Sequence, residues 1–524
     1  MRYLVTNQSE SFKSEDYKII TVEESLFVLR ELGEEVGLDT ETEGLDPHTK
    51  KLLSVQIGNY NTQIMIDCTT VNIQLYKQYL ESKVLFVLWN VKFDYKFFLK
   101  QGIVLRNVYD GYLAEQLLWL GYRAGVHSMS LASAANEYLG VHLDKSVRGK
   151  IISKGLSSEV VVYGCDDVKY LLPIKELQMK KITENELTVA LKVENAFAKA
   201  LAYIEYSGIK LNVERWKTKM DKDLSLLNTA RDSINKWVSD YFISHNGKDG
   251  FIEDYIIIDD IRLDQNKIDE KIPKEAINIY FDYIDGHDIV CYKVAFPFVS
   301  VNLQGDIFSG FDTEPKCNIN WNSSKQLIPF FEYFGFNLNT KDKKTGRFKK
   351  SVEAKVLSPQ TTIQPEMLEL YLTYTSQAKL VSTYGQTFID QINPATGRIH
   401  TQFSQLMTTG RLSCGGKDKF NRIEYVNIQN LPSDEETRAC FIPEKGNLLI
   451  DCDYSAQEDF IFTELSQEPK LIDFYNDTTR KRDGHSFVAK ICFPKELDGI
   501  EEEEVKHERP DLRALAKKAK FSIK

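Results

Sequence analysis

Four carboxylates lie in three short blocks of the first third of the chain. Asp39 and Glu41 follow the apolar stretch 36–38, Asp94 comes shortly after the apolar run 85–89, and Asp167 lies four residues after Tyr163. Alternate residues of a strand point to one face, so Asp39 and Glu41 could bind a hard divalent cation together. With Asp94 and Asp167 they could hold two ions about 3.5–4 Å apart, the arrangement that activates water in phosphodiester hydrolysis. Tyr163, one helical turn before Asp167, could orient that water.

The three blocks resemble the motifs of the DEDDy family of 3′–5′ exonucleases in their order, in the Asn90-x-x-Phe-Asp94 core and in the Tyr-x-x-x-Asp spacing. A single acidic pair on a strand usually only faces water, but three ordered blocks argue against that interpretation. The resemblance implies a ribonuclease H-like domain that hydrolyses DNA from the 3′ end with Mg²⁺ or Mn²⁺, two ions per active site. Asp39, Glu41, Asp94 and Asp167 would be metal ligands, and Tyr163 would be catalytic.

Bulk properties narrow the class of protein. A length of 524 residues predicts several domains, and no apolar run approaches the roughly 20 residues of a membrane helix. The N-terminus lacks a secretory signal pattern, and the eight cysteines include no Cys-x-x-Cys pair, which argues against structural zinc and suits a reducing compartment. We therefore expect a cytoplasmic protein. The net charge of −10 does not indicate nucleic-acid binding, which depends on local basic patches.

A second group of motifs lies in the last quarter of the chain. The segments Thr409–Ser413 and Asn427–Pro432 precede an apolar run that ends at Asp453. A strand ending there would place the carboxylate at a site for Mg²⁺ and a nucleoside triphosphate. Pro510 opens a predicted helix in which Arg513, Lys517 and Phe521 share one face. Two cations and an aromatic ring suit a triphosphate and a stacked base, although such a helix alone is more often a basic surface helix.

Together these segments resemble family A DNA polymerases, over residues 30–210 and 315–524. The motif spellings are similar to those of bacteriophage enzymes, which would act in the cytoplasm of a bacterial host. The resemblance implies primer–template DNA, single-stranded DNA and deoxynucleoside triphosphates as partners. It also implies that Arg411, Gln429 and Asn430 would bind DNA, with Arg411 and Gln429 in the minor groove. Asp453 would bind the catalytic metals, and Glu458 would be the steric gate against the ribose 2′-OH. The triphosphate would be held by His485, Arg513 and Lys517, and Phe521 would lie beside the incoming nucleotide.

The predicted fold class is α/β, with three regions. Residues 1–185 form the ribonuclease H-like exonuclease domain, and 186–380 a helical thumb-like region. Residues 381–524 form the first part of a polymerase palm and the start of its fingers. Helical periodicity after residue 186 breaks at Gly208, and an acidic insertion near 245–312 alternates apolar and acidic residues, which predicts short strands and a helix.

Two other interpretations stand beside that of the N-terminal part of a proofreading polymerase, and both concern the polymerase motifs expected after Lys524. In the family, the predicted last helix continues into a Tyr-Gly pair and later a His-Asp-Glu block with the second palm carboxylate, so we expect a separate or spliced polypeptide to carry them. A stand-alone DEDDy exonuclease is one alternative, but it leaves Thr409–Phe521 unexplained. A non-catalytic DNA-binding subunit of a split polymerase is the other, and the intact exonuclease carboxylates argue against its being catalytically idle.

Overall fold

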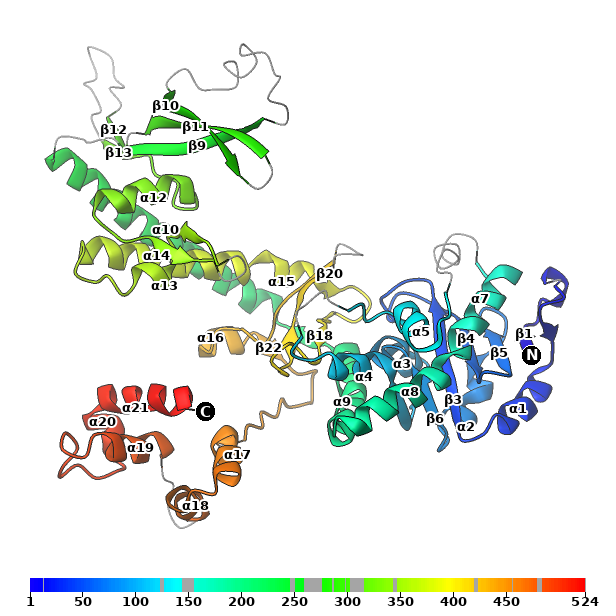
Figure 1. The fold of residues 1–524 in the computed structure, drawn as a ribbon. Coiled ribbons are helices and arrows are strands. Elements are labelled where there is room, and N and C mark those ends of the chain that lie inside the picture. The colour runs from blue at the N-terminus through cyan, green and yellow to red at the C-terminus, as the bar shows by residue number, and fades with distance from the viewer. Residues whose placement is uncertain are drawn as a thin grey trace. The chain divides into compact units, whose positions relative to one another are not determined.

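The computed structural model describes residues 1–12, 14–122, 127–143, 155–245, 250–258, 276–284, 287–296, 298–301, 315–342, 346–418, 423–454, 456–477 and 483–523. It divides into two compact units, Met1–Glu444 and Lys445–Lys524. Figure 1 shows the chain coloured from blue at the N-terminus to red at the C-terminus.

A mixed seven-stranded sheet forms the N-terminal part of the first unit. Its strand order is β2-β1-β5-β4-β3-β6-β7, with β4 antiparallel to both neighbours and β3 parallel to β6. The strands are β1 (Arg2–Val5), β2 (Lys18–Ile19), β3 (Glu35–Thr42), β4 (Leu52–Gly58), β5 (Gln63–Asp67), β6 (Leu85–Leu88) and β7 (Asn107–Asp110). The α/β class predicted for this region is confirmed.

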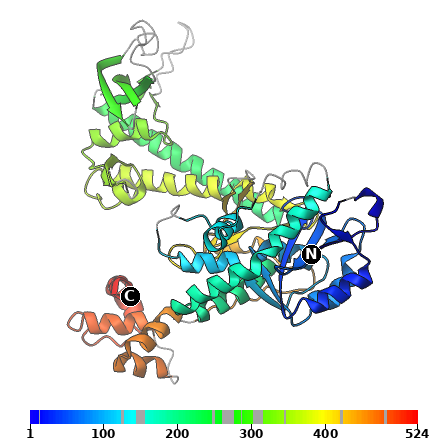
Figure 2. The same ribbon diagram turned by 45° about the vertical axis from the view of Figure 1, so that its right-hand side comes forward.

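Helices cover both faces of this sheet (Figures 1 and 2). They are α1 (Val22–Glu31), α2 (Lys77–Leu80), α3 (Val91–Lys100), α4 (Gly111–Leu118), α5 (Leu131–Leu139), α7 (Ser158–Lys169) and α8 (Leu171–Glu184). Val36 and Leu38 of β3 pack into the core that contains α1 and α3. Because side chains alternate along a strand, Gly37, Asp39 and Glu41 point to the other face, where α7 lies.

Gly37 allows α7 to pass close to β3. A Cβ atom at this position would lie 2.6 Å from the carbonyl oxygen of Val168 in α7, closer than any side chain tolerates. On α7 itself, a Cβ at Gly164 would lie 2.5 Å from the terminal methyl of Met65. The two glycines therefore hold α7 directly against the sheet face from which Asp39 and Glu41 project, as close backbone approach requires.

The next region is helical and begins with α9 (Thr188–Ser207). This helix ends at Gly208, with φ +60°, where a Cβ would lie 2.7 Å from the ring of His400, so the predicted break at Gly208 is confirmed. The long helix α10 (Val213–Ser244) follows and packs beside α14 (Pro365–Thr383) in both views (Figures 1 and 2). Their core contains Ile234, Trp321 and Tyr371. Shorter elements complete this region: α12 (Ser324–Tyr333), β14 (Asn339–Lys341), β15 (Phe348–Lys350) and α13 (Ala354–Leu357).

The acidic insertion contains an antiparallel sheet of order β10-β11-β9, formed by β9 (Gly250–Ile258), β10 (Ala276–Ile284) and β11 (His287–Phe296). The pair β12 (Val299–Val301) and β13 (Pro315–Cys317) follows it. The predicted strands are therefore present. The described residues of the insertion contain no helix, and residues 259–275 and 302–314 lie outside the described ranges.

Small strands complete the first unit. A four-stranded sheet has the order β16-β17-β8-β22, and two hairpins follow β17 along the chain. The elements are β8 (Ile209–Leu211), α15 (Gln386–Asp390), β16 (Ile392–Asn393), β17 (Arg398–Ile399), β18 (Phe403–Ser404), β19 (Ser413–Cys414), β20 (Gly416–Asp418), β21 (Ile423–Tyr425), α16 (Glu435–Arg438) and β22 (Phe441–Ile442).

The second unit is helical and consists of α17 (Gln457–Ser466), α18 (Pro469–Asn476), α19 (Gly484–Cys492), α20 (Val505–Glu508) and α21 (Pro510–Ile523). The predicted helix that begins at Pro510 is confirmed. The predicted strand that ends at Asp453 is absent, because residues 447–454 have irregular backbone. Leu448 is 87% exposed and Ile450 84%. A strand that pairs with no neighbour buries too little apolar surface to be stable. The three domain boundaries drawn from the sequence stay predictions.

Candidate active sites and DNA-contacting residues

Three of the predicted exonuclease carboxylates meet between β3 and α7. Asp39 and Glu41 project from β3, and Asp167 from the facing helix α7. One ligand oxygen of each lies within 4.8 Å of those of the other two. Glu41 is 9% exposed and Asp167 8%, so water screens their mutual repulsion only weakly. Three close carboxylates with little solvent are a donor set that a hard cation such as Mg²⁺ fits, since such ions take oxygen ligands.

Asp94 is on α3 and is not part of this three-carboxylate group. Its Oδ1 accepts a 2.5 Å hydrogen bond from the hydroxyl of Thr40, the residue between Asp39 and Glu41 on β3. Burial raises the pKa of Asp94 to about 7, the Thr40 hydrogen bond opposes this, and the charge of buried Asp110 adds to it. The structure therefore places Asp94 against the strand that carries the two ligand candidates, but on its other face.

Tyr163 lies on α7, one turn before Asp167, and is 9% exposed. Both residues line a cavity of about 470 Å³, together with His142, Asp166 and Tyr170. A cavity of this size is in the range that holds a nucleotide-sized ligand. The predicted spacing of Tyr163 and Asp167 thus puts both side chains on the wall of one cavity next to Asp39 and Glu41.

In the second unit, Arg513 of α21 pairs with Asp483, the N-cap residue of α19. Arg513 donates from Nε at 2.6 Å and from Nη2 at 3.1 Å, the two-pronged geometry of strong guanidinium–carboxylate pairs. Asp483 also accepts from the backbone N–H of His485 and from the Ser486 hydroxyl. Burial would raise the pKa of Asp483, but the Arg513 and Ser486 hydrogen bonds hold it well below its ordinary value. This pair fixes α21 against α19.

Cations surround His485 at this place. Burial lowers its pKa, and the charges of Lys520, Arg513 and Lys517 lower it further. Lys517 is exposed, whereas Lys520 forms a buried 2.8 Å ion pair with Asp459. The structure therefore brings His485, Arg513 and Lys517 together, with Asp483 among them. Their role at a triphosphate stays a prediction. The side chain of Phe521 lies outside what the structure describes.

Asp453 and Glu458, the other predicted polymerase residues, are both exposed in the second unit. Asp453 lies in the irregular segment that was expected to be a strand, and Glu458 lies in the first turn of α17. Their roles as metal ligand and steric gate stay predictions.

Arg411 lies in the loop of the β18–β19 hairpin, where Gly410 has φ +73°. Gln429 and Asn430 follow β21, and both donate their backbone N–H groups to Asn427 Oδ1. All three predicted DNA-binding residues, Arg411, Gln429 and Asn430, are exposed on the surface. Gly415 connects the two segments: a Cβ there would lie 2.9 Å from the Asn427 backbone, so only glycine allows this approach. The hairpin and the 427–430 loop are therefore neighbours.

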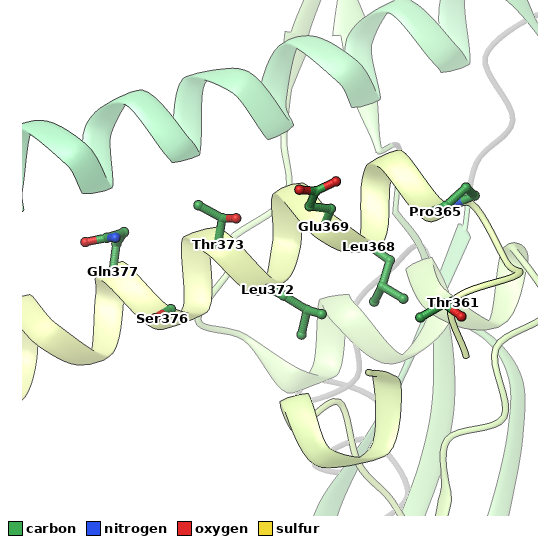
Figure 3. A pocket seen from close by; sticks show the side chains of 8 residues that line it. All are labelled: Thr361, Pro365, Leu368, Glu369, Leu372, Thr373, Ser376 and Gln377. Atoms are coloured by element: carbon green, nitrogen blue, oxygen red, sulfur yellow. The ribbon is translucent and has the colours of Figure 1, made fainter. Parts of the chain in front are cut away.

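A larger cavity in the first unit carries none of the predicted residues. It has a volume of about 640 Å³ and lies along α14 (Figure 3). Figure 3 shows Leu368 and Leu372 on one side of the helix, and Glu369 is the charged residue in its wall. A wall with one acid and no cation does not suit a phosphate.

The sequence did not point to Glu205, although it joins three segments. Its side chain is 2% exposed and pairs with Lys92 at 2.6 Å and Lys96 at 2.7 Å, both on α3. It also accepts the backbone N–H of Phe403 in β18 at 2.9 Å. Burial tends to raise the pKa of Glu205, but the two lysines lower it below its ordinary value. A glutamate inside an amphipathic helix gives no signal of such long-range contacts.

Two family models match the chain: the 3′–5′ exonuclease model over residues 17–183 and the DNA polymerase family A model over residues 305–524. DNA polymerase I of Borreliella burgdorferi is 26% identical over 514 residues, which cover 93% of this chain and 44% of that protein. The thermostable DNA polymerase I of Thermus aquaticus is 35% identical over 210 residues, 39% of this chain and 22% of that protein. The chain thus spans less than half the length of these relatives.

Among solved structures, the POL domain of Pol1 from M. smegmatis, in complex with DNA primer-template and dNTP, is similar in fold. Its TM-score is 0.64 at 18% identity, and the match covers 100% of this chain and 71% of that one. Among the described residues, we find no helix with the length and apolar character needed to cross a membrane. The chain therefore carries a 3′–5′ exonuclease domain followed by a domain of the DNA polymerase family A.

Proposed function

We propose that this chain removes nucleotides from the 3′ end of DNA with Mg²⁺ or Mn²⁺ and binds primer–template DNA and a deoxynucleoside triphosphate, as a proofreading polymerase in replication does. One observation carries the exonuclease part: the ligand oxygens of Asp39, Glu41 and Asp167 lie within 4.8 Å of one another. All are carboxylates, the ligands that hard cations take. Two bound ions would supply an activated water and stabilise the leaving oxygen.

The residues of the chain would divide the remaining work. Tyr163 would hold the attacking water by its hydroxyl, since it lines the same cavity as Asp167. That cavity of about 470 Å³ would take the 3′-terminal nucleotide and exclude most water from it. Asp94 would steady Thr40, and with it the strand segment that carries Asp39 and Glu41. Asp94 is also proposed as a metal ligand, on the resemblance of the Asn90-x-x-Phe-Asp94 motif alone.

The purified 524-residue chain tests this proposal. We expect it to shorten a 5′-labelled single-stranded oligonucleotide from the 3′ end in Mg²⁺ or Mn²⁺ and to stop when EDTA is added. An oligonucleotide with phosphorothioate linkages at its 3′ end should resist degradation in Mg²⁺, because sulfur replaces a phosphate oxygen and binds this hard cation weakly. Products that shorten from the 5′ end, or a rate that EDTA does not change, would contradict the assignment.

The polymerase part of the proposal assigns a ligand to each remaining predicted residue. Arg411, Gln429 and Asn430 would contact the primer–template, and His485, Arg513, Lys517 and Phe521 the incoming nucleotide, with Glu458 against its 2′ position. Asp453 would bind metal. Phosphoryl transfer by two metals needs more than one carboxylate. We therefore propose that Asp453 acts together with a second carboxylate when DNA is synthesised.

Binding of primer–template DNA tests this part without requiring synthesis. Arg411 is exposed in the hairpin loop, so Arg411→Ala should weaken binding roughly three- to tenfold, in the range of one lost charged contact. Fluorescence anisotropy over a series of salt concentrations measures it, because affinity for DNA depends steeply on salt. Arg30→Ala, an exposed arginine on α1, is the matched control. Equal effects of both changes would show that Arg411 contributes only general charge.

A further inference from the structure

A second cavity of the exonuclease region has a strongly basic wall. Its volume is about 500 Å³, and it lies between β7, α8 and α9. Its lining contains Arg106, Lys175, Lys192 and Lys199 and no acidic residue. The chain as a whole has a net charge of −10, so four cations around one cavity are a local departure from its acidic character. Grouped cations without acids attract anions.

This basic cavity lies away from the three-carboxylate group. It is lined by Leu85 and Asn107, at the starts of β6 and β7. Leu85 pairs with both Glu35 and Asn107 in the sheet, so the cavity lies at the end of the sheet where β3 begins. Asp39 and Glu41 come four and six residues further along β3, a distance of roughly 13–20 Å at about 3.3 Å per residue. The basic cavity is therefore separate from the exonuclease site.

The four cations differ in whether they already have an ion pair or a hydrogen bond within the protein. Lys175 pairs with Glu35 at 2.6 Å, and the Lys199 ammonium donates to the Arg106 carbonyl oxygen at 2.5 Å. Burial lowers the pKa of Lys199, so its charge is poorly solvated. The side chains of Arg106 and Lys192 are exposed, and neither has an ion pair among the described residues. These two and Lys199 are thus available to an anionic ligand.

Apolar side chains from the same three elements also line the cavity. Val108 and Leu191 are buried, and Met179 is half-buried beside them. A cavity lined by both cations and apolar side chains fits a ligand that has a charged group and an apolar ring. A volume of about 500 Å³ is in the range that holds one small organic ligand.

We propose that this cavity binds a nucleoside phosphate, with its phosphate between Arg106, Lys192 and Lys199 and its base against Met179 and Leu191. The ligand is either a free nucleotide or the terminal nucleotide of a DNA strand, since both present the same phosphate and base. This site adds to the proposed exonuclease and polymerase functions and does not depend on either.

Calorimetric titration of the full chain with dAMP tests the proposal. EDTA is present throughout, so that metal-dependent binding at the exonuclease site does not contribute. We expect dAMP to bind, adenosine and inorganic phosphate each to bind at least tenfold more weakly, and the double variant Arg106→Ala/Lys192→Ala to lose at least tenfold in affinity for dAMP. A short oligonucleotide that displaces dAMP assigns the site to a strand end, and one that does not assigns it to the free nucleotide.

The matched control is Arg30→Ala/Lys180→Ala, which removes one arginine and one lysine, both exposed and outside the cavity. It should leave dAMP affinity within twofold. Absence of dAMP binding, or equal losses in both double variants, would overturn the proposal. Inorganic phosphate that binds as tightly as dAMP would also overturn it, because the base would then contribute nothing. If the chain degrades DNA from the 3′ end but does not bind dAMP in EDTA, the proposed nucleotide site is wrong and the proposed exonuclease function stands.

Discussion

Asp39→Ala should lower the rate of 3′–5′ hydrolysis of single-stranded DNA by about 10²-fold or more. This carboxylate is one of three whose oxygens lie within 4.8 Å of one another, so its loss leaves too few ligands to hold a divalent cation in place. Groups that stabilise charge in a transition state are typically worth about 10²–10³ in rate each. Asp167→Ala should have a similar effect, since it removes the ligand from the facing helix. Rates are compared at saturating Mg²⁺ with a 5′-labelled oligonucleotide.

Two further variants make this prediction specific. Tyr163→Phe should reduce the rate less than Asp39→Ala, because it removes a hydroxyl that orients water but leaves the carboxylates intact. Glu43→Ala is the matched control: this exposed carboxylate lies one residue beyond β3 and accepts a 3.3 Å hydrogen bond from the backbone of Lys51. It should leave the rate unchanged. A Tyr163→Phe loss as large as that of Asp39→Ala, or a loss of similar size from Glu43→Ala, would contradict these roles.

The parts of the site that the sequence predicts correctly are those set by residue spacing within a single strand or helix. Alternation places Asp39 and Glu41 on one face of β3, and four-residue spacing places Tyr163 and Asp167 on one side of α7. The same spacing places Arg513 and Lys517 on α21, and Gly208 ends α9. Each of these depends on neighbours within a few residues, which the sequence displays directly.

The rest depends on contacts between distant segments. Asp94 is four residues from Asn90, as its motif requires, yet its hydrogen bond to Thr40 reaches back 54 residues. The partner of Arg513 is Asp483, 30 residues earlier. The apolar run before Asp453 has the composition of a strand, but a strand forms only where another pairs with it. Local pattern states what a segment prefers, and tertiary contacts decide whether that preference is met.

Glu205→Ala should strongly destabilise the packing of α9 against α3. The side chain is 2% exposed and lies between the ammonium groups of Lys92 and Lys96, and its loss leaves both cations buried without this carboxylate. Breaking a buried ion pair in this way costs about 3–5 kcal/mol. Hydrogen exchange of the α3 and α9 amides measures the loss locally, which suits a chain of several domains better than one global unfolding transition.

A second glutamate provides the matched control for Glu205. Glu332 pairs with Lys350 at 2.8 Å, but the two side chains are 40% and 44% exposed. Glu332→Ala should cost less than about 1 kcal/mol, as exposed pairs do. Because the two pairs have similar lengths and differ mainly in burial, the difference between the variants isolates the effect of desolvated charge. Equal costs would show that water reaches Lys92 and Lys96 despite their burial.

The same cluster predicts an asymmetry between its members. The ammonium groups of Lys92 and Lys96 share the single carboxylate of Glu205, so this buried cluster of three side chains has a net positive charge. Burial lowers the pKa of Lys92 even though Glu205 faces it. Lys92→Met would leave one cation paired with one anion, so it should cost much less than Glu205→Ala, although it also removes a hydrogen bond to the Phe403 carbonyl. The same hydrogen-exchange measurement compares the two variants, and equal losses of protection would contradict the asymmetry.

The pH dependence follows from the depressed pKa of Glu205. A carboxylate with a folded pKa below its ordinary 4.5 stabilises the fold above that pH and ceases to do so as pH falls toward the folded value. The protection of α3 should therefore fall below about pH 4.5 in the wild type and change little with pH in Glu205→Gln, which has no carboxyl to titrate. Protection that falls equally with pH in both proteins would assign the acid sensitivity to other carboxyls.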